Sequence, residues 1–402
     1  GLGDVYKRQN NSYSLSYIRV LYAMWLVRTV LSYLLTYRKS LLIADQKEYI
    51  ASITGLILNV VSYLAIILLV TWEQNYLLAL GIGTVTEVVL NIWISWYVEQ
   101  KYPFLRQRRK EKSTSSLTKR IVRDLKSLFI SRISEKMLYC TDNLIISGFI
   151  GVGTVGRYAN YCMITQAISN ILTILANTIQ PTVGDYFTEK NRQRNYEILR
   201  QLTFGFFCIA SVVSVGLFSL ITPFVRDIWL GPSYELGWGI TVFCIVVLLV
   251  RIMGLPLSLV MGVTGLFEKE KNVGASSALL NLIVSLALVK PYGMAGVLLG
   301  TLLSYLLQIL YRYIIYFRDF LEMPGEALRY AQDIGEYLAV IAGEVLLMQK
   351  IVPLIYGAGG MLLFCVCFLL CIAIPLLLDL VIFGRGWRLQ SIVTMVKGMR
   401  KA

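Results

Sequence analysis

The chain has 402 residues, of which 56% are hydrophobic and only 15% charged, and its mean hydropathy is +0.65. A soluble domain is about one quarter charged, so this composition excludes an ordinary soluble protein and predicts that the bilayer is the solvent. The chain has no histidine, which excludes Ser-His-Asp and Cys-His catalytic systems and histidine-ligated metals within it.

The first nine residues read like the translated end of a sequencing adaptor. The match lies in Asp4 to Gln9, and we expect 1–9 to be an artefact fused to an incomplete gene. The alternative is a natural basic N-terminus. On the first interpretation, further helices precede residue 10.

Eleven apolar stretches are long enough to cross a bilayer. A helix rises about 1.5 Å per residue, so an apolar core of about 30 Å takes about 20 residues. The predicted spans are 16–37, 49–71, 76–98, 124–149, 154–181, 202–223, 236–264, 272–289, 293–317, 334–355 and 360–383. The predicted fold class is therefore all-α, a polytopic membrane helix bundle.

Basic residues indicate which loops face the cytosol. The loop 99–126 carries ten Lys and Arg against three acidic residues, and the tail after Phe383 carries five and no acid. The positive-inside rule places both segments in the cytosol, as the eight predicted spans between them require. The net charge of +14 is therefore attributed to topology and to anionic lipid headgroups, and no nucleic-acid partner is expected.

The polar connectors divide the chain into successive segments. Two lobes joined by a polar loop are typical of transporters built from repeats. The predicted segments are the remainder of an N-terminal lobe with three spans (10–98), a basic cytosolic loop (99–123), a C-terminal lobe with six spans (124–317), a cytosolic linker (318–333), an accessory helix pair (334–383) and a basic cytosolic tail (384–402).

Basic side chains inside the predicted spans are the first candidates for function. An ionisable group in the bilayer core costs about 2.5–3.5 kcal/mol, so it normally faces a protein interior or a water-filled cavity. Arg28 and Arg251 lie near the middle of their spans, and Arg132 and Lys136 lie on the fourth span. We expect them to line a cationic cavity, with a buried structural ion pair as the alternative for Arg28 and Arg251.

Polar residues at helical spacing form stripes on three neighbouring spans. Such stripes either bind helices together or line a shared hydrophilic cavity, and three together favour the cavity. The predicted polar lining comprises Glu87, Asn91, Asp142, Asn143, Gln166, Asn170 and Asn177. A cavity with arginine, lysine and amide groups suits an anionic, hydroxyl-rich solute such as a phosphate-linked sugar chain.

Acidic residues within the spans are fewer. Glu87 and Glu344 are central in theirs, and Asp142 adjoins the stripe of the fourth span. Glu87 and Asp142 are the candidates for coupling transport to a proton or sodium gradient.

Two glycine patterns have different interpretations. Gly151 to Gly156 matches GxGxxG, but no strand precedes it, so a dinucleotide site is not expected. Gly296, Gly300 and Ser304 form a small face that lets two helices approach closely. No cofactor is expected.

Five segments together carry a recognisable pattern. They are, in chain order, Leu41–Ile50, Thr141–Ser147, Val155–Tyr161, Trp229–Gly231 and Lys290–Val297. On these segments, the chain resembles the bacterial polysaccharide flippases, of the O-antigen or teichoic-acid type, in the multidrug/oligosaccharidyl-lipid/polysaccharide exporter superfamily. The resemblance covers essentially all of 10–383.

The resemblance implies a two-lobed bundle of about twelve to fourteen spans in the bacterial cytoplasmic membrane, with a cytosolic C-terminus. It implies alternating access that moves undecaprenyl-diphosphate-linked oligosaccharides to the outer leaflet for surface polysaccharide biosynthesis. The spans here would be the fourth to the fourteenth, and in relatives the last two help to form a groove for the lipid tail. The implied partners are the lipid-linked glycan, membrane lipid and a glycan polymerase, and the chain is expected to be a monomer.

Two other classes stay open at this point. A multidrug or cation antiporter of the same superfamily would need an acidic cavity, and the basic residues argue against it. A membrane-embedded polysaccharide polymerase, ligase or acyltransferase usually needs a large outer loop with Arg and His, or an intramembrane His. The sequence has neither, so a transporter rather than an enzyme is predicted.

Overall fold

Long apolar helices account for the fold. In the computed structural model the described residues are 15–33, 36–45, 47–73, 76–106, 140–187, 191–357 and 359–384. Within these ranges every regular element is a helix, and nine helices are long and apolar enough to cross a membrane. The predicted all-α membrane bundle is confirmed. Contacts divide the chain into two units, 1–115 and 116–402, and each is described by itself.

The nine helices correspond to nine of the eleven predicted spans. The first predicted span holds α2 (Leu15–Tyr33) and the start of the short α3 (Thr36–Ala44). Two arginines lower the mean hydropathy of α2, so it is not among the nine. Most of the fourth predicted span lies outside the described residues, and its last part, 140–149, is helical.

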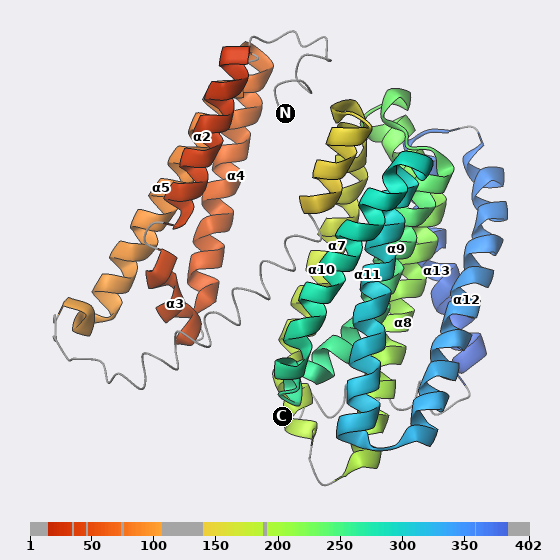
Figure 1. Cartoon of the computed structure of the whole chain (residues 1–402). Coiled ribbons are helices and arrows are strands. Elements are labelled where there is room, and N and C mark those ends of the chain that lie inside the picture. The colour runs from red at the N-terminus through yellow and green to blue at the C-terminus, as the bar shows by residue number, and fades with distance from the viewer. Residues whose placement is uncertain are drawn as a thin grey trace. The chain divides into compact units, whose positions relative to one another are not determined.

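The first unit places three long helices side by side, with α3 at one end (Figure 1). They are α2, α4 (Glu48–Glu73) and α5 (Tyr76–Lys101), and a 3₁₀ turn, η1 (Pro103–Arg106), follows α5. A small core around Leu42 and Val98 joins α3 to α5. Other large apolar side chains of α4, such as Leu56 and Leu68, are exposed, as expected of a helix that faces lipid.

Polar contacts fasten α3 and the turn after it to α5. Arg38 pairs with Glu99 at 2.5 Å. In the turn, Lys47 Nζ and Tyr102 Oη donate to Asp45 Oδ2 at 2.5 and 2.6 Å. The Lys47 ammonium, followed by the Tyr102 hydroxyl, lowers the pKa of the Asp45 carboxyl because both stabilise its charged form. These contacts position the segment Leu41–Ile50, which contributes to the family resemblance.

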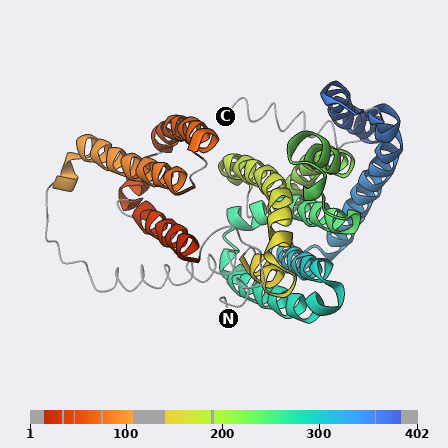
Figure 2. The same ribbon diagram turned by 90° about the horizontal axis from the view of Figure 1, so that it is seen from above.

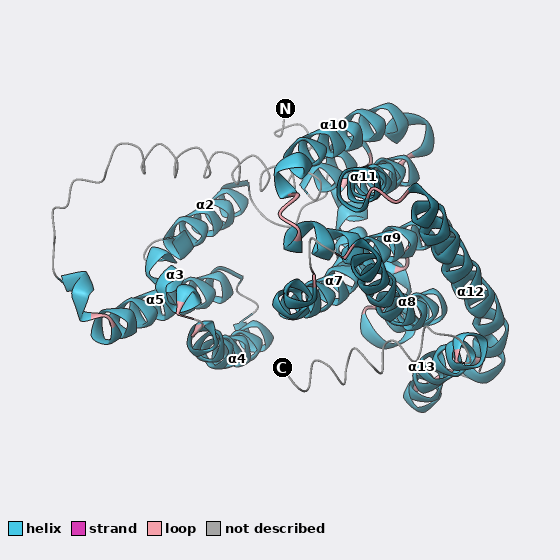
Figure 3. Cartoon of the chain, turned by 90° about the horizontal axis from the view of Figure 1, so that it is seen from below, coloured by secondary structure: helices cyan, strands magenta, loops and turns pink. Residues whose placement is uncertain are grey.

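The second unit is an upright helix bundle (Figure 1). Its elements are α7 (Val152–Tyr186), α8 (Arg192–Pro223), η2 (Phe224–Trp229), η3 (Pro232–Tyr234), α9 (Trp238–Val263), α10 (Phe267–Tyr292), α11 (Met294–Ile315), η4 (Tyr316–Leu321), α12 (Pro324–Tyr356) and α13 (Met361–Phe383). Figures 2 and 3 show α9 in the middle of the unit, with α10 and α11 on one side and α12 and α13 on the other. Both α12 and α13 pack against α8.

Small residues let α10 and α11 approach closely. A Cβ added at Gly296 would overlap the backbone of Leu288, and one added at Gly300 would overlap the Ser285 hydroxyl. Ser304 Oγ donates to the Ser277 carbonyl at 2.9 Å. The predicted packing role of the small-residue face is confirmed.

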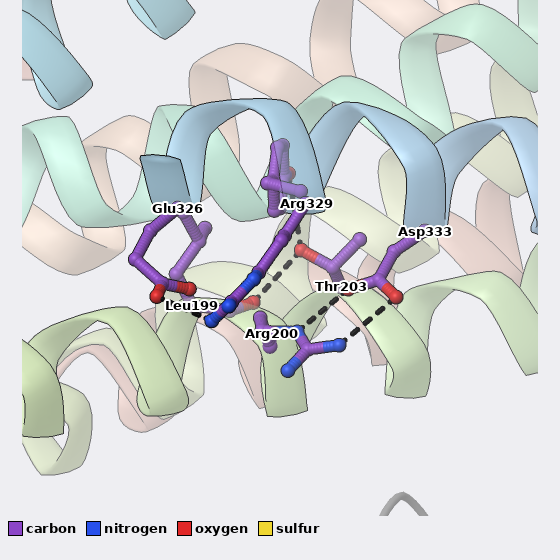
Figure 4. Close-up of polar contacts among 7 residues, drawn as sticks. Leu199, Arg200, Thr203, Glu326, Arg329 and Asp333 are labelled. Carbon is purple, nitrogen blue, oxygen red and sulfur yellow. Dashed lines mark hydrogen bonds and ion pairs between the residues drawn. The ribbon is translucent and has the colours of Figure 1, made fainter. Parts of the chain in front are cut away.

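Helix α12 begins earlier than its apolar span predicts. The segment predicted as a linker, 318–333, contains most of η4 and the first ten residues of α12. Here Arg200 of α8 donates to both carboxylate oxygens of Asp333 at 2.6 and 2.9 Å (Figure 4). One turn away, the hydroxyls of Thr203 and Tyr330 lie 3.1 Å apart. Charged residues lower the hydropathy of this stretch, although its Tyr330 and Asp333 are buried against α8.

An aromatic layer continues the contact of α8 with α12 and α13. Phe207 stacks on Tyr337 with ring centroids 4.5 Å apart, and Phe383 packs edge-on to both at 5.5 and 5.7 Å. Aromatic pairs of this kind contribute about 0.5–1.5 kcal/mol each beyond the area that they bury. The accessory helices are therefore firmly part of the second unit.

Candidate functional site

In the first unit, α2 and α5 bring Arg28, Glu87 and Asn91 together. Arg28 Nη2 lies 3.7 Å from Glu87 Oε1, and the two side chains are 36% and 32% exposed. The guanidinium lies over Gly83, where any Cβ would collide with it. Asn91 Nδ2 donates to the Leu31 carbonyl at 3.4 Å. At 3.7 Å the Arg28–Glu87 contact is an ion pair rather than a hydrogen bond, so the guanidinium keeps donors for an anionic ligand.

In the second unit, Asp142 is the centre of a buried polar cluster. Its side chain belongs to the helical stretch 140–149 and is only 4% exposed. Thr301 Oγ1 donates to Asp142 Oδ2 at 2.7 Å, and Asn281 Nδ2 lies 3.5 Å from Oδ1. Asn281 Nδ2 also donates to Thr301 Oγ1 at 2.8 Å. Three helices thus supply an oxygen-rich cluster around one carboxylate.

The sequence analysis did not predict Asn281 and Thr301. A signal was present, because Ser277, Asn281 and Ser285 recur every four residues in α10 and all three are fully buried. A stripe of this kind on the eighth predicted span would have indicated a polar helix face.

Arg251 lies on α9, toward α11. Its guanidinium carbon is 5.4 Å from the centre of the Tyr305 ring, a cation–π arrangement. Cys162 of α7 interacts electrostatically with both Arg251 and Asp142. Arg251 and Asp142 therefore both lie within electrostatic range of Cys162.

The remaining amides of the predicted lining are on the surface of the second unit. Gln166 Nε2 donates to Asn170 Oδ1 at 2.8 Å along α7. Asn143, Asn170 and Asn177 are exposed. Exposed amides on a membrane helix need a polar neighbour, either protein or water, because lipid tails cannot accept their hydrogen bonds. Arg132 and Lys136 lie outside the described residues.

A cavity of about 760 Å³ opens at the junction of η2, the start of α9 and the end of α12. Among the residues that line it, Arg226 donates to Asp227 at 2.7 and 3.1 Å, and Tyr356 Oη donates to the same carboxylate at 3.0 Å. None of the predicted lining residues borders this cavity. Its lining arginine, Arg226, is already paired with Asp227, so the cavity does not match the predicted cationic cavity.

The fold and its intramembrane polar groups define a polytopic helical membrane protein. Its fold is similar to a solved structure described as the lipid II flippase MurJ in an inward closed conformation. That similarity has a TM-score of 0.63 and 15% sequence identity, and covers 88% of this chain and 71% of the other. Residues 6–187 match the model of a family described as polysaccharide biosynthesis protein. No curated protein is significantly similar in sequence.

The family match agrees with the expected likeness to membrane proteins of polysaccharide biosynthesis, and the likeness to a flippase is one of fold. The family match covers the first unit and the start of the second. The likeness in fold extends over most of the chain.

Proposed function

We propose that this protein is a transporter that flips undecaprenyl-diphosphate-linked oligosaccharides across the bacterial cytoplasmic membrane for surface polysaccharide biosynthesis. The observation that carries the proposal is the partly exposed Arg28, an intramembrane cation whose ion pair among the described residues is the long one to Glu87. A guanidinium matches the oxygens of a diphosphate.

The proposed mechanism is alternating access. The cationic groups bind the diphosphate and sugars from the cytosolic side, and the lipid tail stays in the bilayer. Binding shifts a conformational equilibrium only through different affinities for the two states. The arginines must therefore hold the headgroup more tightly in one state than in the other.

Glu87 and Asp142 remain the candidates for coupling to an ion gradient. Glu87 forms an ion pair with Arg28. A change in the charge of Glu87 would therefore change how strongly Arg28 binds the substrate. Asp142 is buried with hydroxyl and amide neighbours, an environment in which the binding of a small cation is favoured. We further propose that the chain acts as a monomer, with a glycan polymerase as partner.

The test is Arg28→Ala in the full-length protein, expressed in a host that lacks its own flippase. We expect surface polysaccharide to fall about ten-fold or more, because each 1.4 kcal/mol of lost binding is a factor of ten. Arg28→Lys keeps the charge without the planar fork and should retain part of the activity.

Arg19→Ala is the matched control on the same helix, since Arg19 is exposed. It should leave polysaccharide levels unchanged. Normal export by Arg28→Ala, at equal amounts of protein in the membrane, would overturn the assignment. A parallel drug-efflux assay separates this proposal from a multidrug antiporter, for which efflux rather than glycan export would respond.

A further inference from the structure

Three polar residues meet in the interface that joins α12 and α13 to α8. Ser211 is 0%, Glu344 3% and Asp379 3% exposed. Ser211 Oγ donates to Glu344 Oε2 at 2.6 Å. Asp379 interacts electrostatically with both Glu344 and Ser211. Two carboxyl groups therefore share one buried site, although they come from different helices.

Three oxygens in this site are buried without a hydrogen-bond partner among the described residues: Glu344 Oε1 and both carboxylate oxygens of Asp379. A buried carboxylate that lacks donors is strongly disfavoured, and two of them side by side repel each other. Water could donate hydrogen bonds to these oxygens, but it could not neutralise two negative charges. The arrangement therefore requires a positive charge in the site.

Among the residues that the structure describes, the surrounding side chains do not supply that charge. On α8 the neighbouring titratable group is the thiol of Cys208, which interacts with both acids. Toward the start of α8, Phe207, Tyr337 and Phe383 form the aromatic layer. Arg200 lies beyond this layer, about 16 Å along α8 from Ser211, and binds Asp333 with two hydrogen bonds.

We propose that Glu344 and Asp379 form a proton-binding site in which the two carboxyl groups share one proton. Ser211 donates to Glu344 and fixes the orientation of its carboxylate. Asp379 lies four residues before the end of α13. Loss of the proton leaves like charges on α12 and α13, which favours separation of these two helices from each other.

The test is carbodiimide labelling of the full-length protein in native membranes, mapped by mass spectrometry. Dicyclohexylcarbodiimide modifies buried carboxyl groups only when they are protonated. We expect Glu344 or Asp379 to be labelled at neutral pH, with labelling that disappears as the pH rises. Labelling of neither residue at any pH from about 5 to about 9 would overturn the proposal.

Two variants test whether the proton is shared. In Glu344→Gln the neighbouring charge is gone, so the labelling midpoint of Asp379 should move to lower pH by about one unit or more. In Ser211→Ala, Glu344 loses its donor, and its labelling midpoint should move to higher pH. Independent carboxyl groups would give an Asp379 midpoint that Glu344→Gln does not change.

Glu197→Gln is the matched control, because Glu197 is exposed about 21 Å along α8 from Ser211 and should affect neither midpoint. Equal helix content by circular dichroism checks that each variant is folded.

Replacing sodium by choline at constant pH distinguishes binding of a proton from binding of a metal ion at this site. Labelling should not change, and protection by sodium would assign the site to the metal ion instead.

Discussion

The buried acidic residues of the second unit differ in how many hydrogen-bond donors surround them. Asp142 would be costly inside a membrane protein if it stood alone, but Thr301 and Asn281 surround its carboxylate with donors. Arg200 and Asp333 neutralise each other with two hydrogen bonds. Glu344 and Asp379, by contrast, have a single donor in Ser211. Among the described residues, Asp142 and Asp333 are thus satisfied by their neighbours, whereas Glu344 and Asp379 keep oxygens without a donor.

The hydroxyl of Thr301 should contribute measurably to stability. Thr301→Val keeps the side-chain shape but removes the donor to Asp142. The loss should cost about 1–3 kcal/mol, because a buried carboxylate is left without its closest partner. The measurement is the thermal unfolding midpoint in detergent, which should fall by several degrees.

Thr301→Ser is the control, since it retains the hydroxyl and should unfold near the wild-type temperature. If Thr301→Val unfolds at the same temperature as Thr301→Ser, the hydrogen bond to Asp142 is not important for stability.

At the scale of helices, the second unit uses two kinds of contact. α10 and α11 pack through small residues, which bring their backbones close and bury hydroxyl contacts such as Ser304 to the Ser277 carbonyl. α12 and α13 instead pack on α8 through an ion pair, an aromatic layer and an acidic layer. The contact between α10 and α11 is therefore closely packed. The contact of α12 and α13 with α8 contains acidic groups whose protonation can change.

Close packing of α10 on α11 predicts a sharp cost for added volume. Gly300→Ala places a methyl group against the Ser285 hydroxyl and the Asn281 carbonyl, so it should destabilise by about 1–3 kcal/mol. Gly205→Ala in α8 is the matched control, because nothing lies within 4 Å of its added Cβ. The control should be neutral or stabilising by up to about 1 kcal/mol.

Thermal unfolding of the two alanine variants in the same detergent measures the difference. A Gly300→Ala variant as stable as Gly205→Ala would show that α10 and α11 have room to separate.

At the scale of the whole molecule, the distribution of charge predicts the orientation in the membrane. The loop 99–126 holds ten basic residues, while the cavity at the far end of α8 has its Arg226 paired with Asp227. The positive-inside rule therefore places the loop and the C-terminal tail in the cytosol, and the segment after η2 outside. This orientation is also the one in which a flippase would accept its substrate from the cytosol.

Cysteine labelling tests the predicted orientation. In a version that lacks the native cysteines, a membrane-impermeant maleimide added to intact cells should label Ser233→Cys and leave Ser115→Cys and Ser391→Cys unlabelled. All three should react after the cells are opened. Labelling of Ser115→Cys from outside would mean that the positive-inside rule assigns the wrong orientation.

The apolar spans could be predicted from the sequence because a stretch of about 20 apolar residues crosses a bilayer whatever its neighbours are. The spacing of Gly296, Gly300 and Ser304 also predicted the small-residue face of α11, since residues four apart lie on the same face of a helix. Hydropathy failed at the start of α12, where Asp333 lowers the average although its charge is neutralised by Arg200.

Only the tertiary structure decided which polar residues meet. Asp142 and Thr301 are 159 residues apart in the chain, and Ser211 and Glu344 are 133 apart. A stripe on one helix shows which face is polar, but it does not show which helix covers that face. Whether a buried acid finds a donor, as Asp142 does, or lacks one, as Asp379 does, depends on how the helices pack.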